Sequence, residues 1–326
     1  MKIAVDAMGG DHAPEEIIKG AVEAAREGIA EVILVGDEAI VKKELARLGP
    51  VSGVTIHHAS EVVDMAEQPA VALRRKKDSS IAVATRLVKE GTAGGLVSAG
   101  STGAQMSAAL LMLGRIKGVQ RPAIATVLPT LKGGKLILDV GANVDCKPQN
   151  LVEYAQIGSL YTEKVLAVPN PRVGLLNIGT EVTKGNELTL ATYNLLMASG
   201  LNFIGNVEAR DIPCSDADVI VCDGFVGNSL LKFGEGLISA VFQMIQAEMA
   251  RSTRTRIGAA LMLPGFRAMK RRLEYDEYGG APLLGVQGVS IICHGSSKAK
   301  AIKNAVRVAA QCVENRFVEQ ISHYVG

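Results

Sequence analysis

The sequence has no tryptophan, few aromatic residues and no apolar run of membrane-spanning length. Phe, Trp and Tyr together make up 4% of its 326 residues. No apolar stretch approaches the roughly 20 residues that a spanning helix needs, which argues against an integral membrane protein. The first residues, MKIAVDAMGG, read directly as a strand and do not have the pattern of a secretory signal. We therefore expect a cytoplasmic protein, with binding to a membrane surface left open.

Paired cysteines and an excess of charge of one sign are missing as well. Five cysteines are present without a C-x-x-C pair, which argues against a disulfide framework or a zinc site. Lys and Arg number 35 against 33 Asp and Glu, so the formal net charge is only +2. This balance argues against a nucleic-acid-binding protein that works by overall charge. We expect no bound metal and no nucleic-acid partner.

What the sequence does contain is one plan, repeated along most of the chain. A short branched apolar run ends in a Gly-rich polar loop, and an amphipathic helical pattern follows. The runs are KIAVD, EVILVG, GGLVS, KLILDV, RVGLLN, DVIVCD and GVSIIC. Apolar strands that alternate with helices predict an α/β fold with a mostly parallel sheet covered on both faces. We expect residues 1–326 to form one unit, with two lobes around a cleft as a possible subdivision.

The Gly-rich loops follow the carboxyl ends of the expected strands, where open parallel sheets bind ligands. Six loops have this position: DAMGGDH, SAGSTGA, DVGANVD, NIGTEVTKGN, CDGFVGN and CHGSS. We expect them to gather along one edge of the sheet as a long polar cleft. Any one of these loops alone is more typical of a plain turn between strand and helix.

The loop SAGSTGA is the best candidate for an anion site. Small residues between a strand and a helix start can form a cradle of backbone N–H groups. We assign to this cradle Ser98, Gly100, Ser101, Thr102 and Gly103. Candidates for phosphate or substrate binding in the other loops are Asp6, Gly9, Gly10, Asp11, His12, Asn143, Thr180, Asp223 and His294. The alternative roles of the polar side chains are turn bonding and helix capping.

Lys184 and Asn228 each lie beside a glycine where a helix is expected to begin. A cation and an amide donor placed across a cleft can hold an anion and stabilise an oxyanion. The alternatives are a solvated lysine and a helix N-cap. Motifs of nicotinamide, Walker A, serine-elbow and zinc-protease sites are absent, namely G-x-G-x-x-G, G-x-x-x-x-G-K-[ST], G-x-S-x-G and H-E-x-x-H.

Residues 248–275 break the repeated plan. Basic residues alternate there with apolar ones, and Gly258, Pro264 and Gly265 interrupt the pattern. We predict two short basic amphipathic helices joined by an apolar elbow. Such a hairpin can bind an anionic membrane surface. Its membrane contacts would be Ile257, Leu261, Leu263, Phe266 and Arg267. A helical arm that packs on a partner subunit is the alternative, and the two roles are compatible.

Several long motifs together resemble one family. The segments MKIAVDAMGGDHAP, SAGSTGA, LLNIGTEVTKGNELT, NFIGNVEARDI, DGFVGN and EYGGAPLLGV occur in the order typical of the bacterial phosphate acyltransferase (PlsX) family of phospholipid synthesis. The resemblance covers nearly the whole chain. It implies a three-layer α/β/α fold similar to those of isocitrate and isopropylmalate dehydrogenases and of phosphotransacetylases.

The resemblance also implies a reaction and its partners. Inorganic phosphate attacks the thioester of a long-chain acyl-acyl carrier protein, and the products are an acyl phosphate and the free carrier thiol. No cofactor takes part. A membrane glycerol-3-phosphate acyltransferase then uses the acyl phosphate for phosphatidic acid and phospholipid synthesis. The family is homodimeric and associates peripherally with the membrane through an amphipathic hairpin.

The family's catalytic lysine and asparagine match Lys184 in TKGNELT and Asn228 in DGFVGN. In that reaction Lys184 would hold phosphate near the thioester and Asn228 would donate to the carbonyl oxygen, with Ser101 and Thr102 as further phosphate contacts. Three other functions stay open: a phosphotransacetylase-like enzyme for acyl-coenzyme A, a non-catalytic membrane scaffold, and an oxidoreductase of the related dehydrogenase fold.

Overall fold

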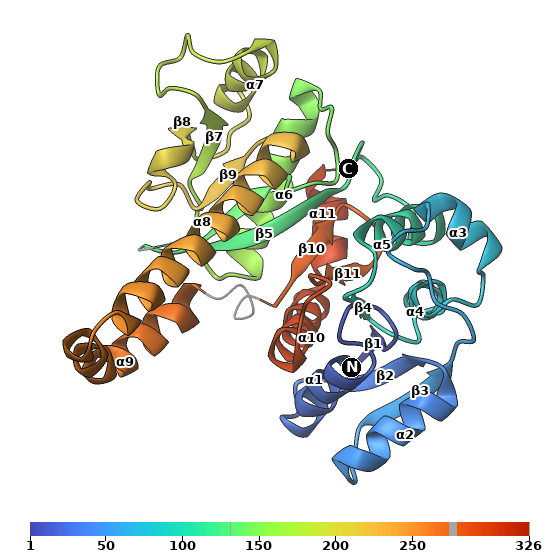
Figure 1. Cartoon of the computed structure of the whole chain (residues 1–326). Helices are drawn as coiled ribbons and strands as arrows, with labels where there is room; N and C mark the ends of the chain where they lie inside the picture. The colour runs from blue at the N-terminus through green and yellow to red at the C-terminus, as the bar shows by residue number, and fades with distance from the viewer. Residues whose placement is uncertain (131, 274–278, 326) are drawn as a thin grey trace.

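One large sheet organises the protein. The computed structural model describes residues 1–130, 132–273 and 279–325. Its 11-stranded sheet has the order β3-β2-β1-β4-β11-β10-β5-β6-β9-β7-β8, and helices lie on both sides of it (Figure 1). The mixed α/β class with a mostly parallel sheet is therefore confirmed.

The strands fall into two parallel groups. The first group contains β1 (Lys2–Asp6), β2 (Glu31–Gly36), β3 (Val54–His58), β4 (Gly95–Ser98) and β11 (Val289–Ile292). The second group contains β6 (Gly133–Leu138), β7 (Val173–Asn177), β8 (Phe203–Glu208) and β9 (Val219–Val221). Between the groups lie β10 (Ala281–Leu284) and β5 (Ala123–Thr130).

The two central strands reverse the direction of the sheet. The pairs β11–β10, β10–β5 and β5–β6 are all antiparallel, so the second group runs opposite to the first. The carboxyl ends of the two groups therefore lie at opposite edges. The expectation that six loops gather along one edge is wrong, because the strands themselves do not all point the same way. The loops form two groups of three instead.

Side-chain alternation along the strands explains the layers of the first group. Ile3 and Val5 of β1 pack into the core with α1 (Glu15–Arg26) and α10 (Ala299–Glu314), whereas Ala4 packs on the opposite face with α4 (Ser80–Lys89). The remaining helices of this half are α2 (Glu38–Leu48), α3 (Pro69–Arg75) and α5 (Thr102–Ala108), and α5 continues as the π-helical turn Ala109–Leu113.

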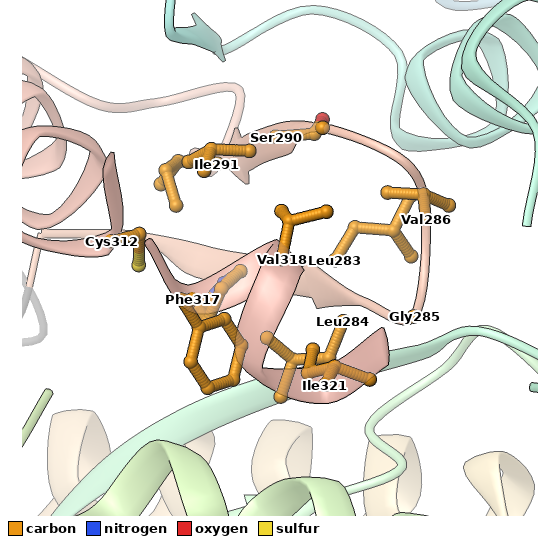
Figure 2. Close-up of a pocket in the computed structure, with 13 residues that line it drawn as sticks. Leu283, Leu284, Gly285, Val286, Ser290, Ile291, Cys312, Phe317, Val318 and Ile321 are labelled. Atoms are coloured by element: carbon orange, nitrogen blue, oxygen red, sulfur yellow. The ribbon is translucent and has the colours of Figure 1, made fainter. Parts of the chain in front are cut away.

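The second group is covered in the same way. Leu136 and Leu138 of β6 pack with α6 (Pro148–Lys164), while Ile137 faces the start of α8 (Gly224–Ala250). The other helices here are α7 (Glu187–Met197) and α11 (Phe317–Val325). Figure 2 shows a small apolar cavity of about 10 Å³ where α11 covers β10 and β11. At about the size of one water molecule, this cavity is a packing defect and not a ligand site.

Helices α8 and α9 (Thr253–Leu273) form an arm that protrudes from the body of the molecule (Figure 1). The predicted elbow is wrong, because α9 continues through Gly258, Pro264 and Gly265. The chain turns at residues 251–252 instead, where Ser252 and Thr255 exchange capping hydrogen bonds. Residues 274 and 275 of the predicted hairpin lie outside the described residues. Of the helices that are described, none is long and apolar enough to cross a membrane.

Candidate active site

The loops after β1, β4 and β11 meet at one edge of the sheet, and we name them the first loop cluster (residues 6–12, 98–103 and 293–297). Asp6 is buried at its centre and accepts hydrogen bonds from the Ser98 hydroxyl (2.7 Å) and the Met8 N–H (3.2 Å). The Ser98 hydroxyl in turn accepts one from the Gly100 N–H (3.0 Å). Burial raises the pKa of Asp6, and these hydrogen bonds offset part of the rise.

The first loop cluster is closely packed. A Cβ added to Gly9 would lie 2.6 Å from the Asp6 carboxylate, and one on Gly103 would lie 2.7 Å from Pro69 of α3. Ser101 caps α5 by accepting a hydrogen bond from the Ala104 N–H (3.4 Å). The cavity beside Asp6, Ser98 and Ser101 holds only about 10 Å³, about the volume of one water molecule.

The other candidates of this cluster stand at its rim. Gly10 has φ of +112°, and the next residue, Asp11, donates its N–H to the Gly295 carbonyl (2.8 Å), which ties the β1 loop to the β11 loop. His294 Nδ1 is hydrogen-bonded to Ser296 of its own turn (2.8 Å to the hydroxyl). The side chains of His12 and Thr102 are exposed. Of the cradle residues, Thr102 is thus the one that presents a hydroxyl to solvent.

The loops after β6, β7 and β9 form a second loop cluster at the opposite edge (residues 139–143, 177–186 and 222–228). Its centre is Asp139, which is fully buried. Its carboxylate accepts hydrogen bonds from the N–H groups of Ile124 (3.1 Å), Gly141 (3.1 Å), Ala142 (2.9 Å) and Asn143 (2.7 Å), and from the Asn143 amide (3.0 Å). Burial raises the pKa of Asp139, and the bonds from Ala142 and Asn143 offset part of the rise.

Helix α8 starts directly on this aspartate. A Cβ at Gly227 would overlap the carbonyl oxygen of Asp139, and one at Gly224 would lie 2.7 Å from that of Asn143. Only glycine therefore allows the first turn of α8 to pack so closely. Asp223 caps the helix by accepting hydrogen bonds from Phe225 (3.0 Å) and Val226 (2.9 Å). The structure thus gives Asn143 and Asp223 bonding roles within the loops.

Asn228 lies on the side of α8 that faces the β6 loop. A Cβ added to Gly141 would come within 3.6 Å of the Asn228 Cγ atom, so the amide lies over this glycine. Val226 and Leu230 are each two residues away, about 200° around the helix, and face the opposite side. Asn228 therefore does not point toward the β7 loop, where Lys184 is found.

The β7 loop presents Lys184 on its surface. Asn177 holds the loop by donating its side-chain N–H to the Lys184 carbonyl (3.0 Å). Gly185 has φ of +112°, which favours glycine, and Asn186 then caps α7 through a hydrogen bond from Thr189 N–H (2.9 Å). The side chains of Lys184 and Thr180 are exposed. This geometry fixes the backbone of Lys184 while its ammonium group can meet a ligand.

A pocket of about 350 Å³ opens between the β7 loop and α8. Its lining is mainly apolar, with a few polar residues at the β7 and β9 loops: Leu151, Leu176, Asn177, Ile178, Gly185, Asn186, Thr189, Ala209, Cys222, Asp223, Val226 and Leu230. Its volume falls in the range of small-molecule sites. Lys184, next to the lining residue Gly185, stands at its rim.

The structure brings some of the predicted site residues together and separates others. Lys184, Thr180, Asn143, Asp223 and Asn228 share the second loop cluster. The cradle residues lie in the first cluster with Asp6, Gly9, Gly10, Asp11, His12 and His294, at the other edge of the sheet. Sequence reasoning did not assign the central role of Asp139. A sequence pattern could have identified Asp139, because LILDVG, like KIAVDAMGG, places an aspartate at a strand end shortly before glycine.

The predicted membrane-contact residues lie on α9. Ile257 and Leu261 are four residues apart and therefore share one helix face, and the side chain of Leu261 is 80% exposed. Leu263 is exposed and Phe266 is half-buried. Arg267 is exposed on the same helix. The described part of the chain has no group of His, Cys, Asp and Glu side chains arranged to hold a metal ion.

Comparison with known proteins decides the family. A family model described as "Fatty acid synthesis protein" matches residues 1–320. "Phosphate acyltransferase" of Moorella thermoacetica is 63% identical over 326 residues, covering 100% of this chain and 96% of that protein. "Phosphate acyltransferase" of Clostridium botulinum is 49% identical over 329 residues, covering 100% and 98%. The chain belongs to the phosphate acyltransferase family.

Membership of the phosphate acyltransferase family confirms the resemblance noted in the sequence and makes the chain an acyltransferase enzyme. Solved structures agree on the fold. A phosphotransacetylase from Streptococcus pyogenes superposes with a TM-score of 0.66 at 19% identity, covering 96% of this chain and 94% of that one. A 4-hydroxythreonine-4-phosphate dehydrogenase from Klebsiella pneumoniae gives 0.53 at 14% identity, covering 96% and 99%. These similarities concern the fold alone.

Proposed function

We propose that the chain transfers a long-chain acyl group from acyl-acyl carrier protein to inorganic phosphate. The acyl phosphate then serves phosphatidic acid and phospholipid synthesis through a membrane glycerol-3-phosphate acyltransferase. The observation that carries the proposal is the full-length similarity to proteins named phosphate acyltransferase. The exposed Lys184 beside an apolar pocket supports it, because the reaction needs a cation for phosphate and an apolar place for the acyl chain.

The chemistry needs little proton transfer. A phosphate oxygen attacks the thioester carbon and forms the new carbon–oxygen bond, and the carbonyl oxygen becomes an oxyanion. The carbonyl double bond then re-forms as the carbon–sulfur bond breaks and the thiolate leaves. Phosphate is already ionised at neutral pH, so a strong base is not required. Lys184 holds the phosphate and Asn228 donates to the oxyanion.

The first loop cluster lies apart from Lys184, so its part in the proposed reaction depends on a second copy of the chain. Phosphate contacts by Ser101 and Thr102 stay a prediction, and strand direction sets them apart from Lys184 within one chain. A homodimer would allow loops of two copies to approach each other. Helix α8 offers a face for such an assembly, because its apolar residues at four- and three-residue spacing are exposed: Phe233, Leu237, Val241 and Met244.

The α8–α9 arm supports the proposal of a cytoplasmic enzyme bound peripherally to the membrane. Its basic residues, among them Arg254 and Arg256, favour anionic lipid, and Ile257 and Leu261 present apolar surface beside them. Delivery at the membrane would keep a lipophilic, easily hydrolysed acyl phosphate from water. Leu261→Glu should release the protein from anionic vesicles, whereas the exposed Leu111→Glu on the body should not. Equal vesicle binding by both variants would show that Leu261 of the arm does not contribute to membrane binding.

The proposed function is tested by the release of free thiol from palmitoyl-acyl carrier protein, with and without inorganic phosphate. We expect phosphate-dependent release and an acyl phosphate product. The same assay with palmitoyl-coenzyme A separates the donors. Release from palmitoyl-coenzyme A alone would identify the protein as a phosphotransacetylase-like enzyme. If neither donor gave phosphate-dependent release, acyl transfer to phosphate would be refuted.

A further inference from the structure

The pocket between the β7 loop and α8 offers almost nothing to a polar ligand. Its polar lining groups are already bonded within their own turns: Asn177 to the Lys184 carbonyl and to the Ile178 N–H, Asn186 to the Thr189 N–H, and Asp223 to the N–H groups of Phe225 and Val226. Apart from the second oxygen of the Asp223 carboxylate, the lining is mainly hydrocarbon, from Leu151, Leu176, Ile178, Val226 and Leu230. The pocket therefore suits an apolar ligand.

The position of the pocket relates it to the reacting groups. Gly185 and Asn186 of its lining directly follow Lys184, whose exposed side chain starts beside Gly179 of the same loop. The backbone of Lys184 therefore adjoins the pocket, and the apolar surface lies beyond it. A substrate with a charged or polarised head and an apolar tail matches this order. A two-carbon acyl group would leave most of the 350 Å³ empty, whereas a long acyl chain would fill it.

The apolar surface continues past the pocket along α8. Val226 and Leu230 line the pocket, and Phe233 and Leu237 follow at three- and four-residue spacing on the same helix face. The side chains of Phe233 and Leu237 are 70% and 52% exposed. In a single copy of the protein, an acyl chain longer than the pocket can therefore leave it along apolar surface instead of entering water.

We propose that this pocket binds the acyl chain of the thioester substrate and that Leu230, midway between Val226 and Phe233, sets the preferred chain length. This inference rests on the proposed function and adds to it the part of the molecule that recognises the hydrocarbon. Each methylene buried in such a pocket strengthens binding about fourfold. A bulky side chain at position 230 takes the space of several methylenes and so selects against long chains.

The test compares kcat/KM for palmitoyl- and octanoyl-acyl carrier protein in wild type, Leu230→Trp and Leu230→Ala. We expect the palmitoyl-to-octanoyl ratio to fall about tenfold or more in Leu230→Trp, because two displaced methylenes already amount to this factor. In Leu230→Ala the ratio should stay or rise. Leu111→Trp is the matched control, since Leu111 is exposed on the other half of the molecule, and its ratio should stay within twofold of wild type.

The outcomes separate this inference from the proposed function. Wild type without phosphate-dependent release from either donor overturns both. An active wild type with an unchanged ratio in Leu230→Trp overturns the acyl pocket alone. A shift of Leu230→Trp to smaller species in sedimentation, with the ratio unchanged, would assign this face to a second copy of the chain. Should Leu230→Trp fail to fold in circular dichroism, Val226→Trp, at a more exposed position of the same pocket, carries the same prediction.

Discussion

The two loop clusters are built alike and end up different. Each has a buried aspartate at a strand end, Asp6 or Asp139, that accepts hydrogen bonds from the loop after it, and each packs glycine against neighbouring backbone. Beside Asp6 in the first lies a cavity of about 10 Å³, whereas the second has a pocket of about 350 Å³ next to the loop that carries the exposed Lys184. A Gly-rich loop after a strand therefore packs closely at that end of the sheet. The neighbouring helices determine whether a pocket remains beside the loop.

The largest difference we expect between the clusters concerns their aspartates. Asp139→Ala leaves four N–H groups and an amide without their acceptor, and should lower the free energy of unfolding by about 3–5 kcal/mol. Asp6→Ala removes the acceptor of Met8 and Ser98 and should cost about 2 kcal/mol. Urea unfolding of both variants measures this. Equal losses would mean that Asp139 is not the stronger organising residue.

Asn228→Ala tests function in the second cluster. Loss of one oxyanion donor should lower kcat for phosphate-dependent thiol release by about 10²–10³-fold. Because the side chain is half-buried over Gly141, the unfolding temperature should change little. Gln243→Ala, an amide truncation further along α8, provides the control and should keep wild-type kcat. Comparable rates in the two variants would remove Asn228 from the reaction.

Gly227→Ala tests the close start of α8. An added Cβ would overlap the Asp139 carbonyl, so the helix start must shift, and we expect a loss of about 1–3 kcal/mol in the free energy of unfolding. Gly234→Ala on the same helix meets no atom within 4 Å. It should stabilise the protein by up to about 1 kcal/mol through helix propensity. The thermal denaturation midpoints should therefore move in opposite directions, and a common direction would contradict the packing described.

Much of this architecture follows from local sequence. Branched apolar runs such as EVILVG predict their strands because only a buried parallel strand is apolar on both faces. Pro148 marks the start of α6 because a proline fits the first turn of a helix. Ser252 and Thr255 are capping residues and mark the turn between α8 and α9 in the sequence. Pro264 lies inside α9 and does not end it, although a proline there removes a hydrogen bond and crowds the preceding turn.

Local sequence does not predict which loops come together at the site. The direction of β5 and β10 depends on long-range pairing with β6 and β11, and their short apolar sequences carry no sign of it. The loops of Lys184 and of Ser101 and Thr102 were therefore expected along one edge of the sheet, and they lie at opposite edges. Likewise, the sequence does not show that Asp223 accepts hydrogen bonds from Phe225 and Val226, or that the Asn143 amide donates to the Pro122 carbonyl and the Asp139 carboxylate.

The smallest difference we expect concerns the two helix caps. Asp223 accepts two hydrogen bonds of 2.9 and 3.0 Å, whereas Ser101 accepts one of 3.4 Å. Asp223→Ala should therefore cost about 1–2 kcal/mol of stability and Ser101→Ala about 0.5 kcal/mol. Chemical denaturation of the two variants gives the comparison, and a larger loss for Ser101→Ala would show that the first cluster depends more on its cap.

The central claim is that acyl transfer to phosphate takes place at the second loop cluster. The most direct test compares Lys184→Ala with Lys298→Ala, which removes an exposed lysine next to the first cluster. Both are assayed for acyl phosphate formation from palmitoyl-acyl carrier protein and radiolabelled phosphate. We predict a loss of about 10²–10³-fold in kcat/KM for Lys184→Ala and a change within twofold for Lys298→Ala. Wild-type rates in Lys184→Ala, or an equal loss in Lys298→Ala, would contradict the account.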